Sequence, residues 1–309
     1  MSWLRTLAAG AAAPIYPSIG AGMLAEVEQL FASAPGLRRA ASPRDAALLL
    51  VAGDIPAEAR PALDRLHDQL PHPRRTLAWK AGEPSTQISA RLNEAWRDLA
   101  HGAPSEPDRL PDEPPNPWRG IGPHGQGGKG MMGGTPRGRP MAMTGADIRD
   151  GLELDRYTAR VGPFAPMLPP GLTLELTLQG DVIVEAHVLS LPFPQPEEAD
   201  LPALCAARML RLLGLEGAAD RMTRGHAPRA AWIRGAVPAG LGAWPGAGDA
   251  RDRLDAWLSG RQEGGAPRDP ARALPGLEWH EATLLLASFA PGTLRRALAE
   301  AQDLQEIPA

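Results

Sequence analysis

The residues best suited to chemistry gather between positions 118 and 145. This segment holds ten glycines, three prolines and four methionines. It also carries cationic residues but contains no Asp or Glu. Glycine allows close backbone approach, arginine pairs with carboxylates and phosphates, and methionine adapts to irregular apolar surfaces. The composition predicts a partner-binding loop. Its expected contact residues are Arg119, His124, Gln126, Lys129, Met131, Met132, Arg137, Arg139, Met141 and Met143.

The same segment contains a formal nucleotide-binding pattern, G-x-G-x-x-G, at Gly125, Gly127 and Gly130. That fingerprint requires a strand before it and a helix after it, but Pro123 precedes it and Pro136 follows. A P-loop is also disfavoured, because Gly130 stands where Ser or Thr would reach magnesium. The glycines therefore indicate a loop that contacts a partner, rather than a nucleotide-binding site. Its histidine could be a ligand or a proton carrier, and a simple loop residue is the favoured interpretation.

Other reactive side chains are isolated. Cys205 is the single cysteine, so the chain can form no internal disulfide and no cysteine-held cluster by itself, and its apolar surroundings favour a core role. The charges around positions 147–160 alternate in sign, which favours a solvated, self-paired face. Five histidines lack metal-ligand spacing: His67, His72, His187, His226 and His280. We therefore expect no catalytic residues, no metal site and no cofactor.

Composition excludes several classes of protein. The 309 residues carry a net charge of −4, so no global positive field attracts nucleic acid or anionic lipid. Glycine and proline number 34 each, which predicts many loops. No run approaches the ~18 apolar residues that cross a bilayer. Residues 1–13 could form a short amphipathic helix with Trp3, Leu4 and Leu7 on one side.

The elements that must position these residues follow from periodicity. Helical spacing over 22–32, 61–70 and 87–99 alternates with apolar strands at 46–52 and 76–79. This order predicts a small parallel-sheet, flavodoxin-like α/β unit. Thr173–Leu178 and Val182–Val188 flank a Gln-Gly-Asp turn and predict a β-hairpin. Further helices are predicted at 201–213, 218–223, 250–258, 279–288 and 293–304.

Two segments resemble known subunits. AALLLVAGDI at 46–55, PALDRLHDQLPHP at 61–73 and TLAW at 76–79 are similar to the small iron–sulfur subunit of respiratory complex I and of energy-converting nickel–iron hydrogenases. GPFAP at 162–166 and PGLTLELTLQGDVIVEA at 170–186 resemble the N-terminal hairpin of their large subunit. The resemblance implies a fusion of two neighbouring subunits. It divides the chain into 1–102, a linker and loop at 103–160, and 161–309.

The departures from that family concern electron transfer. The resemblance implies a [4Fe–4S] cluster held by four cysteines, yet Ile19-Gly-Ala-Gly22 and Lys80-Ala-Gly82 occupy the matching places. The hairpin also lacks the family's histidines, and no Cys-x-x-Cys pair is present to hold nickel. The resemblance thus implies a chain that is not catalytic by itself. We expect a scaffold at the inner face of the cell membrane, docked on antiporter-like subunits that move ions or solutes.

Two alternatives stay open. One is an oxidoreductase subunit, related to NADH–quinone oxidoreductase, that uses a partner's cluster or binds quinone between its halves. The other is a stand-alone binder of small molecules.

Overall fold

The computed structural model describes residues 2–111, 143–149, 151–166, 168–226, 233–264 and 269–305. Four parallel strands form the centre of the N-terminal part, in the order β2-β1-β3-β4. They are β1 (Ala13–Ile19), β2 (Leu37–Arg39), β3 (Leu48–Ala52) and β4 (Arg75–Trp79). The parallel α/β unit predicted from the alternating pattern is therefore confirmed.

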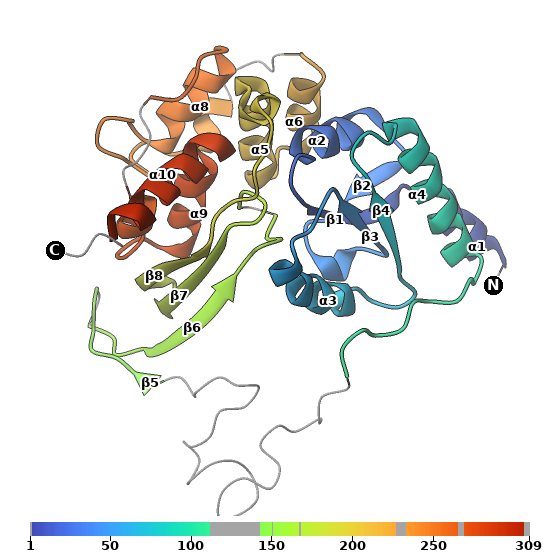
Figure 1. Cartoon of the computed structure of the whole chain (residues 1–309), viewed down its shortest axis with the longest axis horizontal. Coiled ribbons are helices and arrows are strands. Elements are labelled where there is room, and N and C mark those ends of the chain that lie inside the picture. Colours follow the sequence, from blue (N-terminus) through green and yellow to red (C-terminus); the bar gives the residue numbers. More distant parts are fainter. Residues whose placement is uncertain are drawn as a thin grey trace, which may run out of the picture.

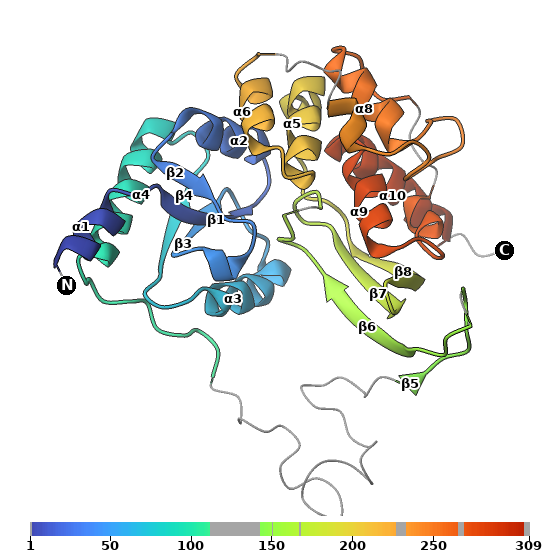
Figure 2. The same ribbon diagram turned by 180° about the vertical axis from the view of Figure 1, so that it is seen from behind.

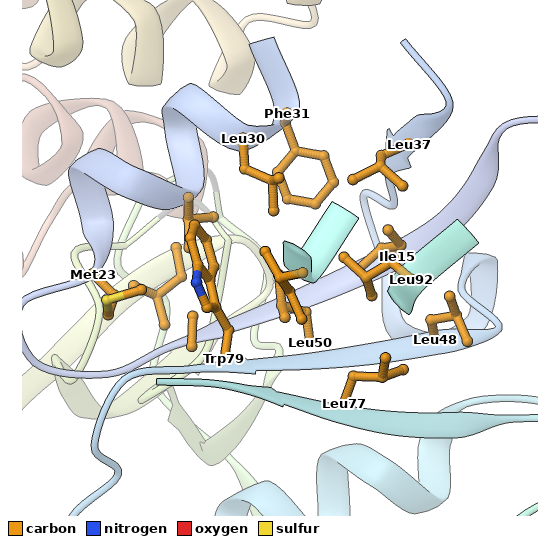
Figure 3. Close-up of a cluster of buried hydrophobic side chains, with 14 of the residues drawn as sticks. Ile15, Met23, Leu30, Phe31, Leu37, Leu48, Leu50, Leu77, Trp79 and Leu92 are labelled. Atoms are coloured by element: carbon orange, nitrogen blue, oxygen red, sulfur yellow. The ribbon is translucent and has the colours of Figure 1, made fainter. Parts of the chain in front are cut away.

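Helices cover both faces of this sheet (Figure 1). They are α2 (Leu24–Ser33) and α4 (Ser85–Ala100) on one face and α3 (Arg60–Gln69) on the other. Figure 3 shows the core beneath α2 and α4, where Leu50 and Trp79 are buried. Burial of each such large apolar side chain contributes about 1.5–3 kcal/mol. Coverage of both faces explains why 46–52 is a continuous apolar run rather than an alternating one.

The central strand β1 was not predicted, because it contains Pro14 and Pro17. Proline lacks the amide hydrogen that a strand ladder uses, so it normally argues against a central strand. Pairing with β3 starts only at Ile15, after Pro14, and pairing with β2 ends at Ile15, before Pro17. Neither proline therefore removes a ladder hydrogen bond.

An N-terminal helix, α1 (Ser2–Ala9), lies beside α4 (Figure 2). Trp3 and Leu7 are both 67 % exposed, so these two apolar side chains are largely uncovered. Among the described helices, none combines the length and apolar character needed to cross a bilayer.

The second part begins with an antiparallel sheet in the order β5-β6-β7-β8. It contains β5 (Met143–Thr144), β6 (Asp155–Val161), β7 (Thr173–Gln179) and β8 (Val182–Ser190). The predicted hairpin is β7 and β8. The charged run expected to be a solvated face includes β6, whose residues are all exposed or half-buried and include Arg160, which pairs with Glu175 of β7.

Five helices complete the described second part. They are α5 (Pro202–Leu212), α6 (Glu216–Thr223), α8 (Ala250–Leu258), α9 (Trp279–Ala287) and α10 (Pro291–Gln305). α9 and α10 share one apolar cluster with β7 and β8, whereas α5, α6 and α8 share another. α6 packs against α2, so the helices of the second part lie directly on the first part (Figures 1 and 2).

Candidate ligand pocket between the two parts of the chain

Of the predicted contact residues, Met143 alone falls within the described residues. It begins β5, at one edge of the antiparallel sheet, and is 58 % exposed. The others lie outside the described residues: Arg119, His124, Gln126, Lys129, Met131, Met132, Arg137, Arg139 and Met141.

The two segments that match the family's cluster-binding places lie at the carboxyl ends of β1 and β4, on either side of β3. Gly20 N donates to Ala52 O, and Gly53 N donates to Trp79 O, which sets the ends of β1, β3 and β4 side by side. Met23 and Trp79 are both 2 % exposed, and Figure 3 shows them at the same end of the core. Apolar side chains, none of which is a thiolate that could bind a cluster iron, thus fill this edge.

The single thiol is elsewhere. Cys205 lies on α5 and is buried, and this burial raises its pKa to about 12 despite the opposing effect of Arg208. A cluster needs several thiolates at one place. The residues at this sheet edge therefore do not fit an iron–sulfur cluster. Among the described residues, no group of three His, Cys, Asp or Glu side chains is arranged to hold a metal ion.

A segment of the second part closes the same sheet edge. The Gln195 side chain accepts a hydrogen bond from Leu24 N at 3.1 Å and donates one to Gly20 O at 3.0 Å. Beside it, Gly22 N donates to Pro194 O at 3.0 Å. The turn after β1 and the start of α2 are thus hydrogen-bonded to a residue that follows β8.

A pocket of about 210 Å³ lies next to this contact. It forms where β2 stops at Arg39, opposite Ile15, so that Pro17 and Ile19 have no strand partner on that side among the described strands. The second part supplies the opposite wall through residues 163–170 and α5. Apolar side chains dominate that wall, and Tyr16 fixes it by donating a hydrogen bond from its hydroxyl to Phe164 O at 2.7 Å.

A buried carboxylate and two arginines form one side of the pocket. Glu28 of α2 is 1 % exposed and bonds Arg39 Nη1 at 2.5 Å and Arg211 Nε at 2.8 Å. Burial alone would raise the pKa of Glu28, but the two guanidinium groups outweigh it and lower that pKa to about 2. Arg211 also bonds Asp220 of α6 at 2.7 Å. Glu28 is therefore ionised, and its carboxylate is paired with both guanidinium groups.

A third arginine lines the pocket without an ion-pair partner among the described residues. Arg208 lies one turn before Arg211 on α5 and lines the pocket, yet it has no hydrogen bond or ion pair to any described residue. Arg208 is half-buried, and burial lowers the pKa of its guanidinium. A cation in this state favours an anionic ligand.

A second polar group lies along the edge strand β4 and resembles a Ser–His–Asp arrangement. Ser105 Oγ lies 2.6 Å from His72 Nδ1, and His72 Nε2 lies 3.6 Å from Asp108. However, Ser105 Oγ already accepts from Arg74 N and donates to Glu106 O, and Asp108 pairs with the buried Arg74. The hydrogen bonds of the Ser105 hydroxyl thus hold the proline-rich segment 103–111 in place. We assign it no catalytic role.

Comparisons with known proteins returned no relatives. No family model, no curated protein and no solved structure matched this chain.

Sequence reasoning missed the pocket residues. Glu28, Arg208 and Arg211 lie in helices that were predicted correctly, but they were not recognised as a site. One local signal was available, because Arg208 and Arg211 are three residues apart and share a helix face that also carries buried residues.

Proposed function

We propose that this chain is a non-redox peripheral subunit, or scaffold, of a complex I-like or hydrogenase-like membrane assembly. It docks on antiporter-like subunits that translocate ions or solutes, at the cytoplasmic face of the membrane. The proposal combines the resemblance of residues 46–79 and 162–186 to two neighbouring subunits with the fold of each segment.

One observation carries this proposal. Gly, Ala and Lys residues follow the carboxyl ends of β1 and β4, where the resemblance implies a cluster, and Met23 and Trp79 are buried nearby. The Gln195 amide then closes the edge from the other part of the chain. This packing supports a protein that keeps contact between two subunit-like parts and has given up electron transfer.

Affinity purification tests the proposal. The tagged chain, expressed at its native level, is purified from detergent-solubilised membranes of its source organism and analysed by mass spectrometry and iron determination. We expect antiporter-like membrane subunits to co-purify, and the isolated chain to be colourless with less than about 0.1 iron per chain. Recovery only as a free monomer contradicts docking. Stoichiometric iron, or a quinone reduced by the preparation, supports the oxidoreductase alternative instead.

A charge-reversal pair tests the predicted contact loop. Arg137→Glu with Arg139→Glu should move the chain from the membrane fraction to the supernatant without lowering its melting temperature. Arg44→Glu with Arg60→Glu is the control, because it makes the same change of charge at two exposed positions of the N-terminal part. Equal release by both pairs would show that total charge, rather than the loop, determines membrane association.

A further inference from the structure

We propose that the pocket beside Arg208 binds a small monocarboxylic acid. The Arg208 guanidinium takes the carboxylate, and the apolar body of the acid lies against Ile19, Phe164 and Leu168. This inference rests on the pocket itself and is independent of the membrane assembly proposed above.

The other arginines with largely buried side chains all have polar partners. Arg253 is 1 % exposed and donates to Ser288 Oγ and to the carbonyls of residues 242, 247 and 248. Arg74 is equally buried and pairs with Asp68 and Asp108. Arg211 pairs with two carboxylates. Arg208, which is half-buried and lines the pocket, has no such partner among the described residues.

Nearby acids do not supply that partner. The charges of Glu28 and Asp200 act on Arg208, but neither carboxylate forms an ion pair with it. Both oxygens of Glu28 bond other arginines, and Asp200 accepts a hydrogen bond from Gly292 N at 2.8 Å. Glu216 borders the pocket but is exposed, so water screens its charge. A ligand carboxylate would complete the guanidinium's bidentate geometry.

The rest of the lining favours a carboxylate over a phosphate. Four of the lining residues are prolines, at positions 17, 163, 166 and 170, and proline offers no amide hydrogen. Phosphate sites at loops and helix N-termini use several backbone N–H donors, and a dianion here would also lie close to the ionised Glu28. A singly charged acid needs fewer hydrogen-bond donors and is repelled less by Glu28. Its hydrocarbon body can pack against proline and phenylalanine.

The volume sets the size of the acid. An apolar cavity of about 150 Å³ accommodates benzene, and this pocket measures about 210 Å³. The ligand therefore has about six to nine carbons. Octanoate and benzoate are suitable probes of the flexible and the rigid form of such an acid.

Calorimetric titration of the purified full-length chain provides the test. Octanoate and benzoate should bind, whereas octanamide and benzamide, which keep the shape but not the charge, should bind at least about tenfold more weakly. Arg208→Met should weaken binding of the acids by about ten- to a hundredfold. Arg221→Met is the matched control, because it removes an exposed arginine from the adjacent helix α6, and it should leave affinity within about twofold.

Two further measurements exclude indirect effects. Arg208→Met should fold and should melt no lower than the parent chain, because it removes a cation that lacks an ion pair. Ala165→Trp should block the acids by filling the pocket while keeping Arg208. Equal affinity for acids and amides, tighter binding of inorganic phosphate or of a short-chain quinone, or unchanged binding by Arg208→Met would each overturn the inference. Absence of binding at about 10 mM acid would overturn it as well.

Discussion

The Glu28 carboxylate accepts a hydrogen bond from Arg211 Nε across 2.8 Å of space and 183 residues of chain. Glu28 belongs to the α/β part and Arg211 to the helical part, so this ion pair crosses the boundary between them. Arg39 bonds the other carboxylate oxygen and lies 5.7 Å from the centre of the Phe31 ring. A buried charge with two cationic partners therefore forms part of the contact between the parts.

Substitution of Glu28 by glutamine should destabilise the protein by about 3 kcal/mol. The change preserves shape but leaves two guanidinium groups in a buried site without their shared counter-charge. Urea unfolding followed by circular dichroism measures the effect. Glu26→Gln is the control on the same helix, because Glu26 is exposed, and it should alter the free energy of unfolding by less than about 0.5 kcal/mol. Similar values for the two variants would contradict the assigned role of Glu28.

The contribution of Glu28 should depend on pH in a defined direction. Its pKa is lowered from 4.5 to about 2 in the folded state, so its stabilising effect is complete above pH 4.5 and is lost as the pH falls toward 2. This interval of 2.5 pKa units corresponds to about 3 kcal/mol. The difference in unfolding free energy between the parent chain and Glu28→Gln should thus be larger at about pH 6 than at about pH 3. A difference that stays constant over this range would refute the assignment.

The buried hydroxyl of Tyr16 should titrate abnormally. Burial raises the pKa of Tyr16 to about 12, although Arg39 acts in the opposite direction. Because the chain has two tyrosines, the variant Tyr157→Phe leaves Tyr16 as the single phenol for an absorbance titration. The midpoint should lie near 12, and a midpoint near 10 would place Tyr16 in solvent.

Removal of the same hydroxyl should weaken the wall of the pocket. Tyr16→Phe deletes the hydrogen bond to Phe164 O and should cost about 1 kcal/mol. Urea unfolding measures the loss. A loss of less than about 0.5 kcal/mol would mean that the Tyr16 hydroxyl makes no net contribution.

The Cys205 thiol should be chemically silent in the native protein. Burial raises its pKa to about 12, so almost no thiolate is present at neutral pH. A thiol-specific chromogenic reagent should react with one equivalent only after denaturation. Ala57→Cys introduces a thiol at an exposed position and should react at once, which verifies the assay. Rapid labelling of the native parent chain would contradict the burial of Cys205.

Local patterns were sufficient for most of the fold. The continuous apolar run at 46–52 predicted β3, and the Gln-Gly-Asp turn predicted the hairpin of β7 and β8. β1 was missed because Pro14 and Pro17 are atypical of a central strand, and only the limits of its pairing with β2 and β3 show why they are tolerated. The pairing depends on residues more than 20 positions away, which periodicity does not reveal.

The pocket could not be predicted from local sequence patterns, for a related physical reason. Glu28 and Arg211 become partners only after two distant helices pack together, and each looks like an ordinary surface charge in its own helix. Arg208 is distinctive because of what surrounds it, and its surroundings come from β1, the segment 163–170 and α5. Side-chain types along the chain do not encode that juxtaposition in any short motif.

Gln195 has a practical consequence for anyone who wishes to shorten this protein. Its amide group supplies a hydrogen-bond acceptor to the first turn of α2 and a donor to the turn after β1. A fragment ending before the hairpin would begin α2 without that cap. Truncated versions are therefore poor surrogates for the intact molecule, and binding partners are best sought with both halves present.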